Sequence, residues 1–479
     1  MTRTCTLEIA GGALVVTPDS LNLATPYVLC EQQDWFEYEI SFLRRLLQQG
    51  QRAIDVGANY GVYTLSIAKA VGPTGSVWAF EPASSTAALL AQGIAANGFT
   101  QVVLEMSALS RECGTAQLTL HDEPELNALS RAEQSPGASE TVRVVSLDDC
   151  LQRYGWRDID FVKIDAEGEE ANIIEGGRRF LEDLSPLILY EVKAAKAIHL
   201  ELVHTFAALG FNSYRLVPGL DLLVPFDTLE KPDDYLLNLF CCKADRAASL
   251  SERGLLLDAS SCDAYRAGNR LDDYLGKHRH EYIWQNKLAT LPYGAECATL
   301  WESSSVDGAA ANDALTCFAV SQDVRLGPLD RFNALATSLR SLVSLCQGQP
   351  PSLRLASLAR VASDYGARSI AVEALRQLLG KLVRDKWVDM GEPFVSPGKR
   401  FDNIAPRNNI QDWILASALE EFERLHAFSS FYTGDNARRR LELIVSLGYE
   451  SAEMRRRLDL IKARFPKPDE AANPPASHG

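Results

Sequence analysis

Acidic residues stand at the ends of apolar runs, where a ligand could reach them. Asp55 lies within the run Ala53–Val56, and Glu81 follows the run Ser76–Phe80, 26 residues further along the chain. Short apolar runs of this kind are typical of buried parallel strands. Ligands of open α/β sheets bind beyond the carboxyl ends of such strands. The pattern therefore predicts a ligand site to which Asp55 and Glu81 both contribute.

A loop with a glycine at each end follows the first run. It reads Gly57-Ala58-Asn59-Tyr60-Gly61, and a helical pattern runs from Val62 to Val71 behind it. Because Gly57 and Gly61 have no side chain, a strand–loop–helix unit of this kind brings a ligand against bare backbone. A tight turn without any ligand has the same pattern, so the loop alone leaves both interpretations open.

The residues around this loop favour one cofactor over another. A dinucleotide loop usually keeps a third glycine and binds pyrophosphate at the helix start, whereas Asn59 occupies the middle of this loop. The carboxylate of Asp55 suits a ligand with an amino group and disfavours one with phosphates. Glu81 is placed to accept hydrogen bonds from a ribose. These features predict S-adenosyl-L-methionine rather than NAD.

Three further strands extend the predicted site. The run Val102–Met106 ends at Ser107 and Ala108, which we expect to flank the adenine unless they form a plain strand end. Asp165 follows a strand predicted for residues 159–164, and Glu191 follows one predicted for residues 187–190. The carboxyl ends of parallel strands meet at one edge of the sheet. Asp165 and Glu191 are therefore predicted as catalytic residues that bind the acceptor or accept its proton.

Other residues compete for these roles or have simpler explanations. Lys163 should be buried and needs a charged partner, so an ion pair explains Asp165 equally well. His199 is a second candidate for the base, although a lone histidine on a helix is more often structural. The acidic residues Glu167, Glu169 and Glu170 open a helix, and the helix dipole alone explains at least two of them. Two more carboxylates, Glu37 and Glu39, fit a solvated helix face better than a ligand site.

Six stretches together resemble FkbM-type S-adenosylmethionine-dependent methyltransferases. They are DVGANYGVYT from Asp55, FEP from Phe80, SALS from Ser107, VSLDD from Val145, DFVKIDAEGEE from Asp160 and ILYEV from Ile188. The resemblance covers roughly residues 36–243. It implies an α/β fold with a doubly wound, mostly parallel, Rossmann-like sheet that ends in an antiparallel strand pair near residues 211–217 and 236–242. It also implies methyl transfer to a hydroxyl of a sugar, a glycan precursor or a secondary metabolite.

The length of 479 residues predicts two or three domains. Composition and pattern change near residue 245, and from residue 329 apolar residues recur at helical spacing. We expect a methyltransferase domain at 1–245 with its core at about 50–215, a connecting region at 246–328, an all-α domain at 329–465 and a disordered tail at 466–479. The polar loop at 124–139 is a candidate lid. The all-α domain could bind a protein partner, and the arginines at 438–440 and 455–457 are expected to lie at solvated helix ends.

Charge and cysteine content exclude several functions. Residues 1–245 hold 18 Lys and Arg against 34 Asp and Glu, which disfavours a nucleic-acid substrate. The ten cysteines form no CxxC pair and no metal-ligand spacing, so we expect reduced core cysteines, a cytoplasmic protein and no metal site. No apolar run is long enough for a transmembrane helix. Two alternatives stay open, a catalytically silent partner-binding protein and a nicotinamide-dependent oxidoreductase.

Overall fold

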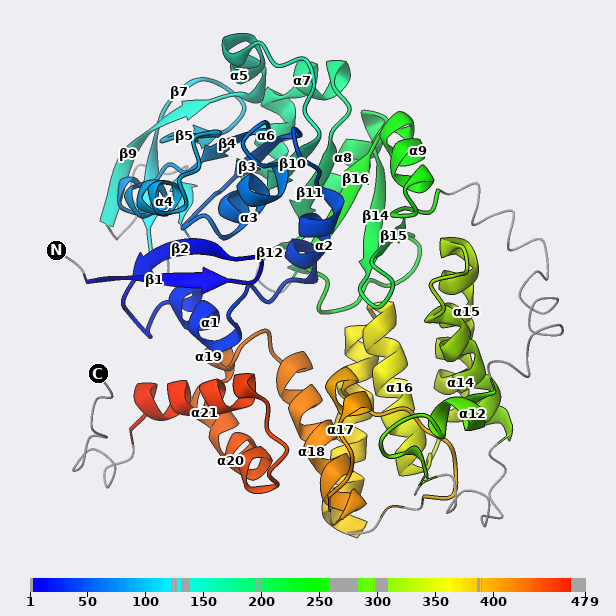
Figure 1. The fold of residues 1–479 in the computed structure, drawn as a ribbon. Helices are drawn as coiled ribbons and strands as arrows, with labels where there is room; N and C mark the ends of the chain where they lie inside the picture. The colour runs from blue at the N-terminus through cyan, green and yellow to red at the C-terminus, as the bar shows by residue number, and fades with distance from the viewer. Residues whose placement is uncertain are drawn as a thin grey trace. The chain divides into compact units, whose positions relative to one another are not determined.

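The computed structural model describes residues 3–121, 124, 127–130, 138–194, 197–198, 200–258, 283–295, 297, 309–385, 388, 390–407 and 409–466 (Figure 1). The chain forms two compact units. The first consists of Met1–Leu216, Leu223–Pro232 and Leu236–Leu255, and the second of Val217–Leu222, Asp233–Tyr235 and Leu256–Gly479. Within the described residues, no helix combines the length and the hydropathy that crossing a bilayer requires.

An eight-stranded mixed sheet forms the centre of the first unit. Its strand order is β15-β14-β16-β11-β10-β3-β4-β5. Strands β11, β10, β3, β4 and β5 run parallel, whereas β16 is antiparallel to both of its neighbours. In the order of the sheet, the strands are Leu222–Pro225, Asn212–Val217, Asn238–Cys242, Leu187–Glu191, Phe161–Ile164, Arg52–Val56, Ser76–Phe80 and Val102–Glu105. The predicted parallel strands and the antiparallel finish are confirmed, while β15 was not expected.

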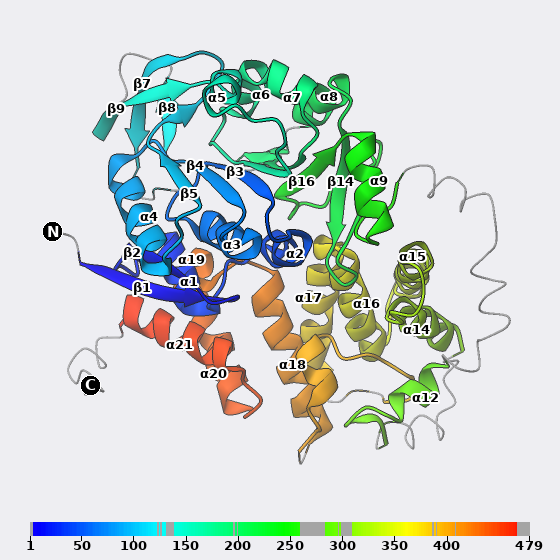
Figure 2. The same ribbon diagram turned by 45° about the horizontal axis from the view of Figure 1, so that its top comes forward.

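Helices cover both faces of this sheet (Figures 1 and 2). On one face, Ile54 and Val56 of β3 share a hydrophobic core with helices α5 to α8. On the other face, the hydroxyl of Thr64 in α3 donates to Asp55, and Phe42 of α2 packs on Phe240 with ring centroids 5.7 Å apart. The helices of the first unit are α1 Ala24–Gln32, α2 Tyr38–Leu46, α3 Val62–Val71, α4 Ser84–Asn97, α5 Leu147–Tyr154, α6 Glu170–Gly176, α7 Arg178–Asp183, α8 Glu201–Ala208 and α9 Ala244–Glu252.

The strand order reverses between β3 and β10. After β3 the chain adds β4 and β5 on one side of it, and it then returns to add β10 and β11 on the other side. In an open α/β sheet, a reversal of this kind leaves a crevice beyond the carboxyl ends of the two central strands. Residues that follow β3 and β10 are therefore placed to contact a ligand.

Three smaller sheets accompany the central one. The first is a hairpin of β1 with β2, and the second is a four-stranded sheet of order β6-β9-β7-β8. Their strands are Thr4–Ile9, Ala13–Pro18, Ala108–Leu109, Ala138–Val145, Gly114–Leu120 and Ala128–Ser130, and a further pair joins β12 Lys193–Ala194 to β13 Ala197–Ile198. The predicted lid at 124–139 thus contains strand β8 and the start of β9, and its residues 125–126 and 131–137 lie outside the described part.

The described elements of the second unit after residue 280 are all helical. They are α12 Trp284–Leu288, α14 Ala309–Ser321, α15 Pro328–Leu345, α16 Ser352–Tyr365, α17 Arg368–Asp385, η2 Lys399–Asn403, α18 Ile410–Leu425, α19 Ser430–Thr433, η3 Gly434–Ala437, α20 Arg438–Ser446 and α21 Ala452–Arg464. Helix α14 packs on α15, so helical packing begins inside the region predicted to be a connection.

The arginine clusters near the end of the chain differ from the expectation. Arg438 and Arg457 are buried rather than solvated, with 3% and 1% of their surface exposed. Arg438 pairs with Asp435 at 2.6 Å, and Arg457 pairs with Glu453 at 3.0 Å. A buried guanidinium requires such partners because an unpaired charge is costly inside a protein. These two arginines therefore serve the packing of the helical unit.

The predicted boundary at residue 245 falls within helix α9, and this has a measurable consequence. Leu250 is buried, Arg246 pairs with Asp160 at 3.2 Å, and the amide of Leu223 donates to Leu255. A fragment ending at residue 243 loses these contacts, whereas one ending at 256 keeps them. We expect the shorter fragment to be less stable by about 3 kcal/mol, from apolar burial and lost hydrogen bonds. Urea unfolding of both fragments tests this, and equal stability would contradict it.

Candidate active site

The loop between β3 and α3 is fixed to the end of β4. The amides of Gly57 and Ala58 both donate to the carbonyl of Phe80, at 3.1 and 3.0 Å. The amide of Asn59 donates to the carboxylate of Glu81 at 2.9 Å. Gly57 and Asn59 have φ values of +76° and +47°, in the left-handed region that favours glycine and, after it, asparagine. The local sequence thus holds the loop in one conformation.

The two glycines of this loop have a packing role, and the ligand contact predicted for them stays a prediction. A β-carbon on Gly57 would lie 1.7 Å from the carbonyl oxygen of Asp165, and one on Gly61 would lie 2.3 Å from the side chain of Leu90. Gly57 therefore allows the loops after β3 and β10 to pack against each other, and Gly61 allows α3 to pack on α4. A substitution at either position is therefore expected to disturb folding, and a loss of ligand binding would follow from that.

Glu81 lies at the centre of the predicted cofactor region. Its two carboxylate oxygens accept hydrogen bonds from the amides of Asn59 and Ala83, each at 2.9 Å. Burial raises the pKa of Glu81 to about 7, although these backbone hydrogen bonds lower it. A carboxylate oxygen has two lone pairs, so each oxygen of Glu81 can accept one further hydrogen bond from a ribose hydroxyl.

Two buried polar atoms near this loop lack hydrogen-bond partners in the described structure. Asp55 is fully buried, and its Oδ2 accepts from the hydroxyl of Thr64 at 2.5 Å, while its Oδ1 has no partner. The hydroxyl of Ser107, equally buried, has no partner either. Because an unpaired buried polar group is unfavourable, both atoms fit a site where a polar ligand supplies the missing partner. Ala108 lies beside Ser107 and is buried.

Ser107 offers a sharp test of this cofactor region. Replacing Ser107 by alanine removes a hydroxyl that has no partner in the folded chain, so the free energy of unfolding should stay the same or rise slightly. If the hydroxyl bonds the cofactor, affinity for S-adenosylmethionine should fall roughly three- to tenfold, the value of one neutral hydrogen bond. Calorimetric titration and urea unfolding of the same variant measure both quantities. Unchanged affinity would remove Ser107 from the site.

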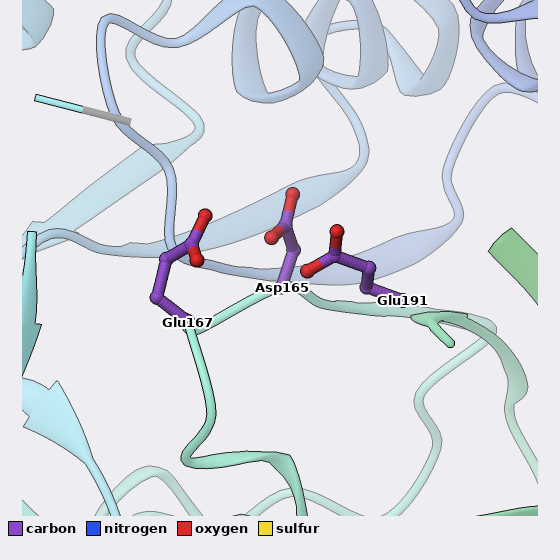
Figure 3. A group of neighbouring side chains, drawn as sticks. All are labelled: Asp165, Glu167 and Glu191. Carbon is purple, nitrogen blue, oxygen red and sulfur yellow. The ribbon is translucent and has the colours of Figure 1, made fainter. Parts of the chain in front are cut away.

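Three carboxylates come together where β10 and β11 end. Asp165 directly follows β10, Glu191 is the last residue of β11, and Glu167 lies in the loop after β10. Their nearest carboxylate oxygens all lie within 4.8 Å of one another, and the carboxylate of Asp165 lies between those of the two glutamates (Figure 3). The sequence predicted that Asp165 and Glu191 meet at this edge. The sequence did not predict that Glu167 joins them. Glu167 has a φ of +45°, a left-handed backbone conformation that spacing along the chain does not reveal.

The other two acidic residues of this loop serve the fold. The carboxylate of Glu170 accepts from the amides of Ala166 and Gly168, at 3.1 and 3.2 Å. Glu169 is buried and accepts from the hydroxyl of Ser110 at 2.7 Å. The carboxylate of Glu170 thus fixes the loop before α6, and that of Glu169 ties the start of α6 to Ser110.

Lys163 and Asp165 form the ion pair that the sequence predicted. The ammonium of Lys163 lies 2.7 Å from Oδ2 of Asp165, and the side chain of Lys163 is 6% exposed whereas that of Asp165 is 36% exposed. Burial lowers the pKa of Lys163, but the charges of Asp165, Asp55 and Glu37 outweigh it and raise the pKa above the ordinary value. Asp165 therefore has one oxygen committed to the ion pair and keeps an open side toward solvent.

Glu37 was expected on a solvated helix face, but it is partly buried against Tyr63, a residue that the sequence did not single out. Glu37 precedes α2, and its carboxylate accepts a hydrogen bond from the hydroxyl of Tyr63 in α3. Lys163 lies over the ring of Tyr63, 4.9 Å from its centroid. Burial raises the pKa of Glu37, although Tyr63 and Lys163 lower it. The only sequence signal was an acidic residue shortly before the loop, and that signal equally fits a solvated helix.

Glu191 has the most perturbed carboxyl group of the cluster. Burial, followed by the charges of Asp165, Glu167 and other neighbouring carboxylates, raises the pKa of Glu191 to about 10. At neutral pH this group keeps its proton unless a positive charge comes beside it. A protonated carboxyl donates a hydrogen bond and cannot act as a base. His199, the other candidate base, lies outside the described residues, so its placement stays a prediction.

Residues 55–213 match the family model of the methyltransferase FkbM domain. This match confirms the resemblance for the N-terminal half, and with it S-adenosylmethionine as the cofactor. A search among curated proteins finds no match.

Solved structures give looser likenesses. A methyltransferase FkbM from Methylobacillus flagellatus is 14% identical, with 40% of this chain and 43% of that chain covered and a TM-score of 0.28. An S-adenosylmethionine-dependent O-methyltransferase from Thermotoga maritima is 15% identical, with 50% and 77% covered and a TM-score of 0.25. A methyltransferase of Streptococcus mutans in complex with SAH is 13% identical, with 43% and 95% covered and a TM-score of 0.26.

Proposed function

We propose that this chain, whose N-terminal half carries an FkbM-type methyltransferase domain, methylates a hydroxyl oxygen of a sugar, a glycan precursor or a secondary metabolite. In this proposal the central sheet is a doubly wound class I methyltransferase fold. The observation that carries the proposal is the cluster of Asp165, Glu167 and Glu191 at the carboxyl ends of β10 and β11, next to the loop after β3. Fold alone does not fix a substrate, so the argument rests on these side chains.

The chain offers a place for each part of the cofactor. Glu81 can accept hydrogen bonds from the ribose hydroxyls, and the unpartnered hydroxyl of Ser107 can bond the adenine. The buried Oδ1 of Asp55 has an open acceptor site for an amino group. When bound, S-adenosylmethionine supplies the methyl group. A cationic ligand is also favoured by the local charge, because among the described residues the carboxylates of Asp165, Glu167 and Glu191 outnumber the ammonium of Lys163.

The acceptor would lie over the ends of β10 and β11. A hydroxyl group donates a hydrogen bond well to an ionised carboxylate, and Asp165 has its second oxygen free of the ion pair with Lys163. Asp165 would orient the hydroxyl and accept its proton as the methyl group moves. Glu191, with its raised pKa, would donate to a neighbouring acceptor oxygen. Sugars and other polyols carry such neighbouring oxygens, which favours them over acceptors with an isolated hydroxyl.

The experiment is methyl transfer from methyl-labelled S-adenosylmethionine to a panel of saccharides, nucleotide-linked sugars and polyhydroxylated metabolites. We expect a product that has gained one CH2 unit and whose new methyl group NMR places on oxygen. A methyl group on nitrogen or carbon would contradict O-methylation. A chain that binds the cofactor and methylates no member of the panel would favour the partner-binding alternative, in which the helical half is the working part.

A further inference from the structure

We infer that Asp165, Glu167 and Glu191 bind a divalent cation such as Mg²⁺, Mn²⁺ or Ca²⁺, with the amide of Asn238 as a fourth polar group of the site. The spacing of metal-binding residue types in the sequence gave no sign of it. The ligands come from the ends of two strands and from the loop between β10 and α6, so only the fold brings them together (Figure 3).

The distances suit a cation that oxygen atoms coordinate. Oxygen atoms bound to Mg²⁺ or Ca²⁺ lie about 2.0–2.6 Å from the ion, so two ligands of one ion are at most about 5 Å apart. The three carboxylates each offer an oxygen within 4.8 Å of the others before any ion draws them in. Small rotations of exposed side chains such as Glu167 would complete the coordination. An all-oxygen set without histidine or cysteine favours hard cations over zinc or copper.

Asn238 gives an independent sign that a polar ligand belongs here. It is 8% exposed, and its Nδ2 has no hydrogen-bond partner in the described structure. Asn238 begins β16, where it stands directly opposite Glu191 in the antiparallel ladder. Residues opposite each other project from the same face, with β-carbons about 4.5–5.5 Å apart. The buried amide therefore faces the cluster, where it could donate to an ion-bound water or, after a half-turn of the amide, offer its oxygen to the ion.

The local charge also favours a cation. The three carboxylates carry three negative charges when ionised, and the ammonium of Lys163, 2.7 Å from Asp165, carries one positive charge. Asp55 and Glu37 add negative charge around the same ammonium, so the surroundings of the cluster are acidic and a divalent cation would offset part of that charge. Like charges at this separation repel each other strongly where water is partly excluded. If the proposed function holds, the ion would lower the pKa of the hydroxyl to be methylated, and with the ion bound Asp165 and Glu191 would act as its ligands rather than as proton acceptor and hydrogen-bond donor.

The test is Mn²⁺ binding to the full chain, measured by electron paramagnetic resonance after EDTA treatment and dialysis, with no cofactor or acceptor present. We expect one Mn²⁺ per chain that Mg²⁺ or Ca²⁺ displaces. Glu191→Gln and Glu167→Gln should each weaken Mn²⁺ binding at least tenfold, and Asn238→Ala several-fold. The matched control is Glu182→Gln on the exposed face of α7, which should change affinity less than twofold.

Two results would overturn the inference. One is the absence of Mn²⁺ binding at millimolar concentration, and the other is binding that Glu191→Gln and Glu167→Gln leave unchanged. Both variants remove a charge from a crowded cluster, so folding should not suffer, and circular dichroism checks this. The proposed function fails separately: a chain that binds Mn²⁺ at this site but transfers no methyl group keeps the site and loses the function. A chain that binds no Mn²⁺ but still transfers the methyl group in EDTA keeps the proposed function and loses the metal site.

Discussion

Replacing Gly57 by alanine should lower the free energy of unfolding of the first unit by more than about 3 kcal/mol, or prevent folding. The added β-carbon would lie 1.7 Å from the carbonyl oxygen of Asp165. That neighbour is backbone at the end of a central strand, so it cannot rotate away as a flexible side chain would. The φ of +76° at Gly57 adds about 1–2 kcal/mol for any L-residue. Loss of cofactor binding would follow from the displaced loop.

Gly98 is the matched control for this substitution. It ends helix α4 with a φ of +66°, and a β-carbon there would meet nothing within 4 Å. Gly98→Ala should therefore lower the free energy of unfolding only by the cost of its left-handed backbone conformation, about 1 kcal/mol. Urea unfolding followed by circular dichroism compares the two variants. Equal losses would mean that the loops after β3 and β10 do not pack as described.

Replacing Asp165 by asparagine should lower the single-turnover rate of methyl transfer by about 10²–10⁴-fold, the usual contribution of a general base. Poorer alignment of the acceptor hydroxyl can add to this loss. Affinity for S-adenosylmethionine should stay within a few-fold, because Asp165 follows β10, which lies on the other side of β3 from β4 and Glu81. The loss of charge also leaves Lys163 without its partner at 2.7 Å, so stability should fall as well.

A double-mutant cycle with Lys163 separates the two roles of Asp165. Lys163→Met keeps the length of the side chain and removes the charge, so in the double variant neither member of the ion pair is left unpaired. Asp55 and Glu37 still lose a nearby positive charge, so only part of the stability should return. If Asp165 acts on the acceptor, the double variant should regain part of the stability but not the rate. If Asp165 matters only as the partner of Lys163, the double variant should regain part of both. The second outcome would remove Asp165 from the chemistry.

The positions of the central strands follow from the sequence because they rest on local signals. The apolar runs at Ala53–Val56 and Ser76–Phe80, ended by glycine or by Glu-Pro, match β3 and β4 closely. The burial expected for Lys163 also predicted an ion pair with Asp165, which the structure confirms. Because the carboxyl ends of parallel strands meet at one edge of the sheet, the sequence also predicted that Glu191 lies beside Asp165, and β10 and β11 are indeed parallel neighbours.

The parts that sequence could not predict depend on contacts between distant segments. The close approach of Gly57 to the carbonyl of Asp165 has no sequence signature, because a ligand loop and a packed loop both require glycine. Glu37 reaches the site through Tyr63, and only the packing of α2 on α3 brings them together. Asn238 lies opposite Glu191 through the register of two strands some fifty residues apart in the sequence. None of these pairings follows from spacing along the chain.

Calorimetric titration of the full chain with S-adenosylhomocysteine and, separately, with NAD tests the central claim most directly. The carboxylate of Glu81, the buried Oδ1 of Asp55 and the free hydroxyl of Ser107 offer partners to a ribose, an amino group and an adenine. They offer no positive charge to a pyrophosphate. We predict one binding site for S-adenosylhomocysteine, with affinity lowered in Ser107→Ala, and no binding of NAD. Binding of NAD without binding of S-adenosylhomocysteine would contradict the account.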